Sequence, residues 1–368
     1  MNPGAEPLLM TPGPTRIPER VLVATHRVLH HRTPEFSDAL AELLRLLRPL
    51  FGTRTADVLP IHATGRAAME GAIVNLFAPG DTVVACTNGK FGEMWANLAE
   101  SYGLDVVRVA SDWNRSADPA EAAGALASSK DARAVLTCHS DTSTGVLNPV
   151  AELAVVAREH GALTLVDGIS SIGATPFLFD EWGLDFAVTS SQKCLMSSPG
   201  VSFVSVSERA WEAVDRSTFP RNYLDFAAIR RTLSAERPET PGTTPVGLML
   251  QVLEALRMIT EEGLDAVFER HERMAATARL RALELGFGLQ GDSIVQRSPS
   301  LSALEVPAGV VPSDLRARMR ERGIQVAGGL GSPGASSIRV GHMGDIRLPD
   351  IERTMDVVAQ VLHGREGS

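Results

Sequence analysis

The chain has 368 residues, of which 44% are hydrophobic and 21% are charged, a composition typical of globular proteins. Its net charge of −9 argues against nucleic acid or an anionic membrane as a main partner. The three cysteines form no Cys-x-x-Cys pair, so neither a disulfide framework nor a structural zinc site is indicated. No apolar run is long enough to cross a membrane, and the N-terminus lacks the pattern of a secretory signal. We therefore expect a cytoplasmic globular protein that is large enough for two domains.

The N-terminal part is predicted to form an arm followed by two helices. Residues 1–18 are rich in proline, which favours an extended arm that does not pack as an element. Helical character follows over Ile17–Leu29 and Thr33–Leu50. In the second segment apolar residues recur at helical spacing, with Thr33 as the expected N-cap and Pro34 in the first turn.

The next segment combines a short strand, a turn of small residues and the start of a helix. We expect the strand at Val58–Ile61 and the helix at Ala67–Leu76. Free backbone N–H groups at a helix start form an anion site, to which Thr64 and Arg66 can add side-chain donors. The alternative is an ordinary capped helix without a ligand.

From residue 82 to residue 206, apolar runs alternate regularly with helical segments. Repeated βα units of this kind predict a mostly parallel sheet that is covered by helices on both faces, an α/β fold. The predicted strands are Thr82–Cys86, Val106–Ala110, Ala134–His139, Leu163–Asp167, Phe186–Val188 and Val201–Val206. The predicted helices are Gly92–Tyr102, Pro119–Ser128 and Val150–His160.

An acid and an amine follow two of these strands and are the strongest candidates for catalysis. Asp167 ends the strand Leu163–Asp167, and Lys193 comes just after the strand Phe186–Val188. Ligands of open α/β sheets collect at the carboxyl ends of the strands. Pyridoxal phosphate requires such a pair, a lysine for the Schiff base and an acid on the pyridine nitrogen. Taken singly, the acid could also be a turn residue and the lysine a solvated charge.

Two loops at other strand ends could contact a planar cofactor. The loop Asn88–Gly92 presents Phe91, whose ring could stack on it. The turn Ser140–Gly145 is rich in hydroxyl groups that could donate hydrogen bonds. Each also has an ordinary interpretation, because a single Phe is commonly a core residue and polar residues are common in turns.

The remainder of the chain predicts a smaller α+β domain. Its boundary is placed at Gly263, which divides the chain after the arm into a large domain, 19–262, and a C-terminal domain, 263–368. The Pro/Thr-rich segment Arg237–Pro245 cannot form a long element. Before the boundary we expect a helix at Val246–Glu261. After it, the predicted elements are helices at Leu264–Leu285, Ser313–Glu321 and Pro349–Leu362, and strands at Leu301–Val306 and Ile338–Val340.

Several motifs, in this order, resemble those of the class V aminotransferases, and more narrowly the alanine–glyoxylate and serine–glyoxylate group. They are TPGPT (11–15), ATGRAAMEGAI (63–73), NGKFG (88–92), DTSTGVLNP (141–149), LVDGISSIG (165–173), SSQKCL (190–195) and SIRVG (337–341). The resemblance covers nearly the whole chain. It implies a fold-type I, pyridoxal-phosphate-dependent homodimer that transfers an amino group from alanine or serine to glyoxylate or pyruvate.

The resemblance also implies a role for each residue that matches a motif. Lys193 would form the Schiff base and then move the α-proton, while Asp167 would keep the pyridine nitrogen protonated. The ring would be contacted by Phe91, Thr142 and Ile169. The phosphate would be held by Thr64, Gly65, Arg66 and Gln192, with Thr240 and Thr243 reaching the phosphate of the partner subunit. The substrate would be bound by Arg339, which takes its carboxylate, and by Gly13.

The sequence departs from the family pattern at three of these positions and leaves rival functions open. Phe91 stands where relatives often have Trp, Arg66 where the mammalian-type members have His, and Thr240 where a Tyr donates across the dimer. The rivals are an aminophosphonate transaminase, a cysteine desulfurase and a non-catalytic accessory subunit. A desulfurase requires a cysteine in a late loop, whereas Cys194 is the last cysteine of this chain. The amino donor is left open by the sequence.

Overall fold

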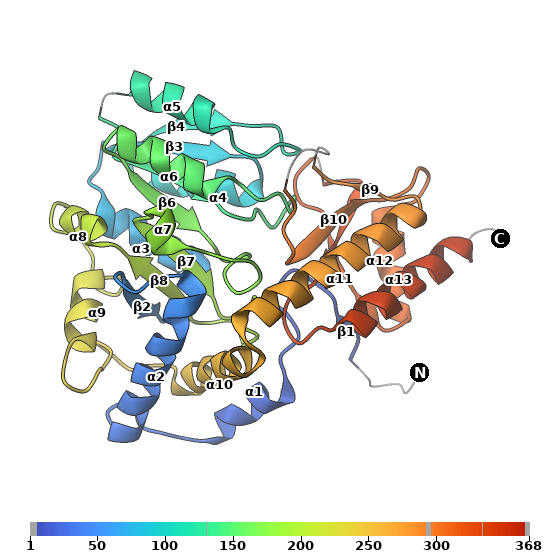
Figure 1. Cartoon of the computed structure of the whole chain (residues 1–368), viewed down its shortest axis with the longest axis horizontal. Helices are drawn as coiled ribbons and strands as arrows, with labels where there is room; N and C mark the ends of the chain where they lie inside the picture. The colour runs from blue at the N-terminus through green and yellow to red at the C-terminus, as the bar shows by residue number, and fades with distance from the viewer. Residues whose placement is uncertain (1–5, 130, 292–295, 333, 365–368) are drawn as a thin grey trace.

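The computed structural model describes residues 6–129, 131–291, 296–332 and 334–364. Within them, the large domain is built on a seven-stranded sheet (Figure 1). The strands are β2 Asp57–Ile61, β3 Thr82–Thr87, β4 Asp105–Ala110, β5 Ala134–Cys138, β6 Leu163–Asp167, β7 Phe186–Ser190 and β8 Ser202–Val206. They lie in the order β2-β8-β7-β6-β5-β3-β4, and β8 runs in the direction opposite to that of the other six strands. The predicted α/β fold with a mostly parallel sheet is confirmed.

Helices cover both faces of this sheet, because alternate residues of each central strand point to opposite sides. Leu165 packs into one hydrophobic core with α3, α4 and α8, whereas Val166 packs into another with α2 and α10. Complete burial of Leu165 contributes roughly 2 kcal/mol. The helices of this domain, after α1, are α2 Pro34–Phe51, α3 Gly65–Leu76, α4 Lys90–Ser101, α5 Pro119–Ser128, α6 Val150–Glu159, α7 Phe179–Trp182, α8 Glu208–Val214, α9 Phe226–Leu233 and α10 Val246–Glu262.

The C-terminal part forms a smaller α+β unit beside the large domain, and the helix α11 connects the two (Figure 1). The boundary proposed from the sequence, Gly263, lies between α10 and α11. The elements of this unit are α11 Leu264–Glu284, β9 Gly288–Leu289, β10 Leu301–Glu305, α12 Pro312–Glu321, β11 Ile324–Gln325, β12 Ala327–Gly328, β13 Ser337–Gly341 and α13 Leu348–His363. Its four-stranded sheet has the order β12-β13-β10-β9 and is antiparallel.

The N-terminal arm is extended, as expected, but the prediction that it does not pack is wrong. The strand β1, Leu8–Leu9, pairs in parallel with β11 of the small domain. Met10 is fully buried in the core of that domain, because its apolar side chain fills a place between the small-domain strands and helices. The first five residues of the predicted arm lie outside the described residues. This packing leads the next segment, residues 11–15, towards the carboxyl edge of the central sheet.

Other departures from the predicted elements are confined to short segments. A single helix was expected over Ile17–Leu29, but α1 spans Glu19–Val23 and continues only as a 3₁₀ turn, Ala24–His26. Pro18 takes an extended backbone conformation and so starts this helix late. The helices α8 and α9 were not predicted, since they are only 7 and 8 residues long.

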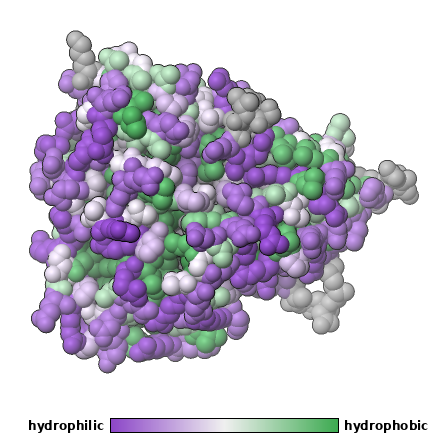
Figure 2. Space-filling model, viewed as in Figure 1, coloured by the Kyte–Doolittle hydropathy of each residue, from purple (hydrophilic) through white to green (hydrophobic). Residues whose placement is uncertain are grey.

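The view in Figure 2 is mainly hydrophilic, with hydrophobic residues scattered between the polar ones. This distribution agrees with the location of most large apolar side chains in the cores. In the part of the chain that the structure describes, no helix is both long and apolar enough to span a membrane.

Candidate functional site

The two candidate catalytic residues lie at the carboxyl ends of adjacent parallel strands. Asp167 is the last residue of β6, and Lys193 follows the end of β7 by three residues. Burial raises the pKa of Asp167 to about 6 and lowers the pKa of Lys193 to about 8. Among the described residues neither group has an ion-pair partner within 4.0 Å, and Lys193 Nζ donates a hydrogen bond to the carbonyl of Pro12. Two ionisable groups are thus held in a poorly solvated place without a salt bridge, and their opposite charges only partly offset the effect of burial on their pKa values.

The carboxylate of Asp167 has few hydrogen-bond donors of its own. Its Oδ1 accepts a hydrogen bond of 2.9 Å from Ile169 N, and its Oδ2 meets the thiol of Cys138 at 3.6 Å. A thiol is a weak donor, so Oδ2 lacks a strong hydrogen-bond partner. Asp167 is only 4% exposed, so little of it is accessible to water. A ligand with an N–H group at this position would supply that partner.

The N-terminal arm closes one side of the lysine. Gly13 has φ +117°, a backbone conformation that side chains with a Cβ rarely adopt. A Cβ at Gly13 would also lie 2.7 Å from Lys193 Cε. Gly13, which was predicted to bind the substrate, and Pro12 therefore lie against the side chain of Lys193. The role of Pro12 was not predicted, because a backbone carbonyl leaves no signal in the sequence.

Arg339 provides a buried cation from the small domain. It belongs to β13 and is 8% exposed, and two of its nitrogen atoms donate to backbone carbonyls: Nε to Gly328 at 2.8 Å and Nη1 to Thr142 at 2.9 Å. Burial lowers its pKa to about 10. In the described part of the chain no acidic side chain pairs with it within 4.0 Å. An uncompensated guanidinium of this kind is suited to a carboxylate ligand.

Thr142 joins this arginine to the loop after β6. Its carbonyl accepts from Arg339, while its hydroxyl shares a short hydrogen bond with the hydroxyl of Ser170. Both hydroxyl-bearing residues are buried. Thr142 was predicted to contact the cofactor, whereas Ser170 was missed even though it lies in the quoted motif GISSIG.

The start of α3 packs against the loop that follows Asp167. A Cβ at Gly65 would lie 2.4 Å from the Cδ1 atom of Ile169, so the backbone of α3 lies directly against this side chain. Thr64 is the N-cap residue but makes no capping hydrogen bond with its side chain, and both Thr64 and Arg66 are exposed. The first N–H groups of a helix have no intrahelical acceptor. These N–H groups and the two exposed side chains are therefore available to an anion beside Ile169.

Gln192 lies between the lysine and the last residue of β7. Its side-chain oxygen accepts a hydrogen bond of 2.6 Å from Ser190 Oγ. A Cβ at Gly65 would lie 3.4 Å from the side chain of Ser190, so Gln192 belongs to the same neighbourhood as the start of α3. This placement is compatible with the predicted contact of Gln192 with a phosphate.

The two threonines predicted to act across a dimer lie on another pocket. Thr240 and Thr243 line a cavity of about 190 Å³ with His62 and Tyr223, at the end of β2. Thr243 is exposed, whereas Thr240 is buried and its hydroxyl hydrogen-bonds to Thr244 and to the carbonyl of Gly242. Of the two, only Thr243 therefore has a hydroxyl group presented at the surface of the single chain.

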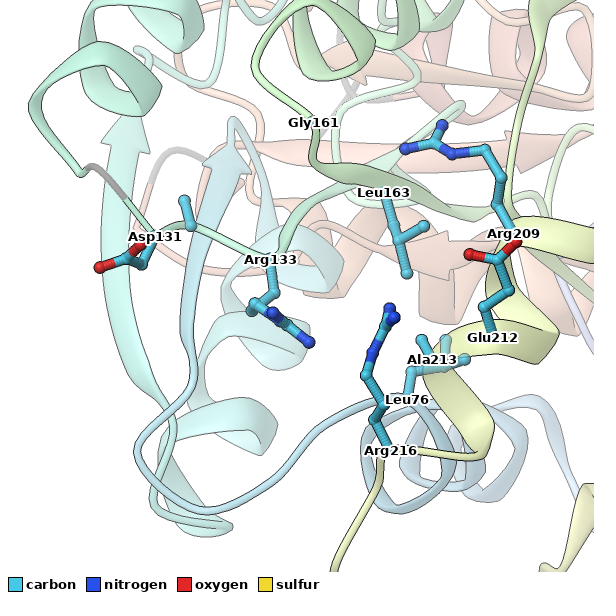
Figure 3. A pocket seen from close by; sticks show the side chains of 10 residues that line it. Leu76, Asp131, Arg133, Gly161, Leu163, Arg209, Glu212, Ala213 and Arg216 are labelled. Atoms are coloured by element: carbon cyan, nitrogen blue, oxygen red, sulfur yellow. The ribbon is translucent and has the colours of Figure 1, made fainter.

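A further pocket, of about 220 Å³, lies at the opposite edge of the sheet (Figure 3). Arg133, Arg209 and Arg216 line it together with Leu163, the first residue of β6. Since Asp167 ends the same strand, this pocket is one strand length away from the candidate site and contains none of the predicted site residues. Among the described residues no cluster of three or more His, Cys, Asp or Glu side chains could hold a metal ion.

The donor set at the carboxyl edge fits pyridoxal phosphate. The open oxygen of Asp167 matches a protonated pyridine nitrogen, and Lys193 provides an amine with a lowered pKa. The start of α3 provides backbone donors for a phosphate. Phe91 lies in the first turn of α4, where its backbone N–H donates to the buried Asp141 at 2.9 Å.

The chain is similar to known proteins over nearly its whole length. The model of the family described as aminotransferase class-V matches residues 16–347. The chain is 38% identical to the soluble hydrogenase small subunit of Synechococcus sp. (strain PCC 6716), over 96% of this chain and 92% of that protein. It is 36% identical to the L-aspartate–glyoxylate aminotransferase of Paracoccus denitrificans (strain Pd 1222), over 92% and 86%. The solved alanine–glyoxylate aminotransferase from Nostoc sp. superimposes with a TM-score of 0.93 at 32% identity, covering 98% of this chain and 97% of that one.

Proposed function

Because the chain belongs to the class V aminotransferase family, we propose that it transfers the amino group of a small amino acid, alanine or serine, to glyoxylate or pyruvate. This family and the fold-type I architecture imply pyridoxal phosphate as the cofactor. One observation carries the proposal: a carboxylate, Asp167, and an amine, Lys193, lie at the ends of adjacent parallel strands without an ion-pair partner within 4.0 Å in the described chain. Burial lowers the pKa of Lys193 to about 8, which favours the uncharged amine that Schiff-base chemistry requires.

Asp167 would hold the cofactor ring in its protonated form. Pyridoxal phosphate, when bound, supplies an electron-withdrawing ring that stabilises negative charge on the substrate α-carbon. With a pKa of about 6, Asp167 is mainly ionised at pH 7.5. Its Oδ2 would then accept a hydrogen bond from the protonated ring nitrogen and keep the proton there.

Lys193 would act as the general base. At pH 7.5 roughly a quarter of a lysine with a pKa of about 8 is uncharged, compared with roughly a thousandth of an ordinary lysine. The uncharged Nζ can bind the cofactor covalently, and once displaced by the substrate amine it can accept the α-proton. Pro12 accepts a hydrogen bond from Nζ and Gly13 lies against the end of this side chain, so both limit its movement.

Arg339 would orient the substrate by its carboxylate. Two of its nitrogen atoms are fixed by backbone carbonyls, so the direction of the guanidinium is set before the substrate binds. A bound carboxylate would compensate the charge that the described part of the chain leaves unpaired. A preference for amino acids over simple amines follows.

A panel of amino donors tests the proposal. The purified protein with pyridoxal phosphate should produce glycine from glyoxylate when alanine or serine is the donor, and alanine from pyruvate when serine is the donor. The same panel includes 2-aminoethylphosphonate, and preferred turnover of that compound would favour the aminophosphonate transaminase. No turnover with any donor would overturn the proposal.

A second candidate is a non-catalytic accessory subunit, because relatives with 38% and 37% identity are named as subunits of soluble hydrogenases. Those names describe the relatives. The presence of Lys193, Asp167 and Arg339 in one site supports catalysis by this chain. Transamination by the purified chain alone, without any added protein, would exclude a purely accessory role.

We further propose a homodimer in which Thr243 reaches the phosphate site of the partner subunit. The exposure of Thr243, Thr64 and Arg66 in the single chain supports this. Lys193→Ala and Thr243→Glu homodimers should each be nearly inactive. In a hybrid dimer both defects fall in one site, so random mixing of subunits should restore roughly a quarter of wild-type activity. No recovery in proven hybrids would reject the shared site.

A further inference from the structure

Asp141 is a completely buried carboxylate beside the candidate site that the proposed mechanism does not use. It lies in the turn after β5, and four hydrogen bonds from two segments converge on it. Its Oδ2 accepts from Phe91 N at 2.9 Å and from Gly92 N at 3.1 Å. Its Oδ1 accepts from the backbone N of Ser143 at 2.8 Å and from the hydroxyl of Ser143 at 2.5 Å. One carboxylate therefore fixes the first turn of α4 to the turn 140–145.

The fit between these two segments leaves no room at Gly89. A Cβ there would lie 2.5 Å from Asp141 Oδ1, although the extended backbone of Gly89 itself is accessible to any residue. The contact is reinforced by Lys90 N, which donates to Ser143 Oγ at 3.0 Å. The position of the Phe91 backbone at the start of α4 thus depends on a contact made through Asp141 and permitted by a glycine.

The same turn also reaches the substrate side of the site. Thr142, the next residue, accepts a hydrogen bond from Arg339 through its carbonyl, and it shares a hydrogen bond with Ser170 through its hydroxyl. Burial raises the pKa of Asp167, and the negative charge of Asp141 raises it further. Asp141 is therefore close enough to influence both ends of the site, but it makes no contact with Lys193 or Asp167 among the described hydrogen bonds.

We propose that Asp141 is a positioning residue for transamination: it holds the Phe91 ring against the cofactor plane and holds the Thr142 carbonyl that orients Arg339. This inference rests on the proposed function and deepens it. The carboxylate acts through Phe91 and Thr142 and does not touch the reacting atoms.

The test compares Asp141→Asn with Asp180→Asn. Asp180 serves as the control because it also accepts four hydrogen bonds from backbone N–H and hydroxyl groups, and none of its partners belongs to the candidate site. It differs from Asp141 in being exposed. An amide presents an NH₂ group to donors that expect an acceptor, so both variants lose hydrogen bonds. In Asp141→Asn we expect the dissociation constant of pyridoxal phosphate to rise, and kcat to fall, by tenfold to on the order of a hundredfold. The visible circular dichroism of the bound cofactor should also weaken.

The variant Asp180→Asn should lose thermal stability but keep the dissociation constant, kcat and visible circular dichroism of the wild type. Equal values of these three quantities in the two variants would overturn the proposal. If Asp141→Asn does not fold, the same measurements are made on Gly89→Ala, because its Cβ must displace the carboxylate of Asp141. Gly124→Ala is the control for this variant. A Cβ at Gly124 meets nothing within 4 Å. A wild type that binds pyridoxal phosphate without turnover would reject the proposed function instead, and the binding and dichroism measurements would still test Asp141.

Discussion

Two aspartates of the large domain, Asp167 and Asp180, have opposite environments. Asp180 binds the turn after α2 to α7: it accepts hydrogen bonds from the hydroxyls of Thr53 and Thr55 and from the backbone of Arg54 and Thr55. Burial alone would raise the pKa of Asp180, but these hydrogen bonds lower it below its usual value. Asp167 is more deeply buried, has one N–H donor and a distant thiol, and has a pKa raised to about 6.

This difference distinguishes a carboxylate that stabilises the fold from one that awaits a ligand. The ionised form of Asp180 is stabilised by the protein itself, so it strengthens the folded state. The ionised form of Asp167 lacks such partners, so it weakens the folded chain until a ligand provides them. Lys193, whose pKa is lowered, and Arg339, whose charge is unpaired, share this property at the same edge of the sheet. The candidate site is thus distinguished by three charged side chains, Asp167, Lys193 and Arg339, that have no ion-pair partner within 4.0 Å in the described chain.

The largest expected effect follows removal of the lysine. Lys193→Ala should lower kcat/KM by about 10⁴-fold or more, because the nucleophile and the general base are lost together. Borohydride reduction followed by mass spectrometry should no longer detect cofactor bound covalently to the chain. The exposed Lys90 provides the control, since Lys90→Ala should retain activity and covalent labelling. Near wild-type turnover of Lys193→Ala would show that the lysine pocket is not the catalytic site.

Substitution of the two aspartates, Asp167 and Asp180, should have different effects on kcat. Asp167→Asn should lower kcat by roughly a hundredfold or more, because an amide does not hold a proton on the ring nitrogen. Asp180→Asn should leave kcat within about twofold of the wild type. The measurement is steady-state transamination of the best donor at saturating cofactor. Equal kcat values for Asp167→Asn and the wild type would reduce Asp167 to a structural residue.

A third comparison concerns Arg339, the buried cation that is expected to bind the substrate carboxylate. Arg339→Lys should raise the KM of the amino donor by roughly tenfold, because an ammonium group cannot replace a guanidinium that is held by two carbonyls and faces a carboxylate. Arg320→Lys, in α12, is the control and should leave KM unchanged. Initial rates over a range of donor concentrations measure both. An unchanged KM for Arg339→Lys would place the substrate carboxylate elsewhere.

In the cofactor-free protein, Asp167→Asn and Asp180→Asn should change the free energy of unfolding in opposite directions. The folded-state pKa of Asp167, about 6, exceeds the ordinary value of 3.8, so its ionisation destabilises the fold as pH rises through that window. The full cost above pH 6 is about 3 kcal/mol. Asp167→Asn should therefore be more stable than the wild type at pH 7.5, by up to this amount, and should lose the advantage at pH 4.

Asp180→Asn should be less stable than the wild type at pH 7.5, by about 1–2 kcal/mol from its lost hydrogen bonds. Because the pKa of Asp180 is lowered, its stabilisation is present above 3.8 and disappears as pH falls below that value. Urea unfolding at both pH values measures these differences. A shift of the same sign for the two variants at pH 7.5 would contradict the comparison.

The sequence predicted the central sheet because its strands are short, almost wholly apolar and separated by helical segments. It also placed Asp167 and Lys193 correctly at strand ends, since position along a parallel strand determines the edge at which a residue lies. It failed for the arm, because two leucines and a methionine before a proline-rich stretch do not reveal a partner strand more than 300 residues away. It missed the role of Asp141, since its four donors come from two segments that only the folded chain brings together.

The claim that this chain is a transaminase is tested most directly by the first half-reaction, in which the donor transfers its amino group to the bound cofactor in the absence of an acceptor. The purified protein is loaded with pyridoxal phosphate, freed of excess cofactor and mixed with alanine, serine or aspartate without any acceptor, and the 2-oxo acid formed is counted. A transaminase whose open carboxyl edge binds one cofactor should form one equivalent per chain and stop, and glyoxylate should then yield one equivalent of glycine. Absence of a 2-oxo acid with every donor, or continued formation beyond one equivalent without an acceptor, would contradict the proposed function.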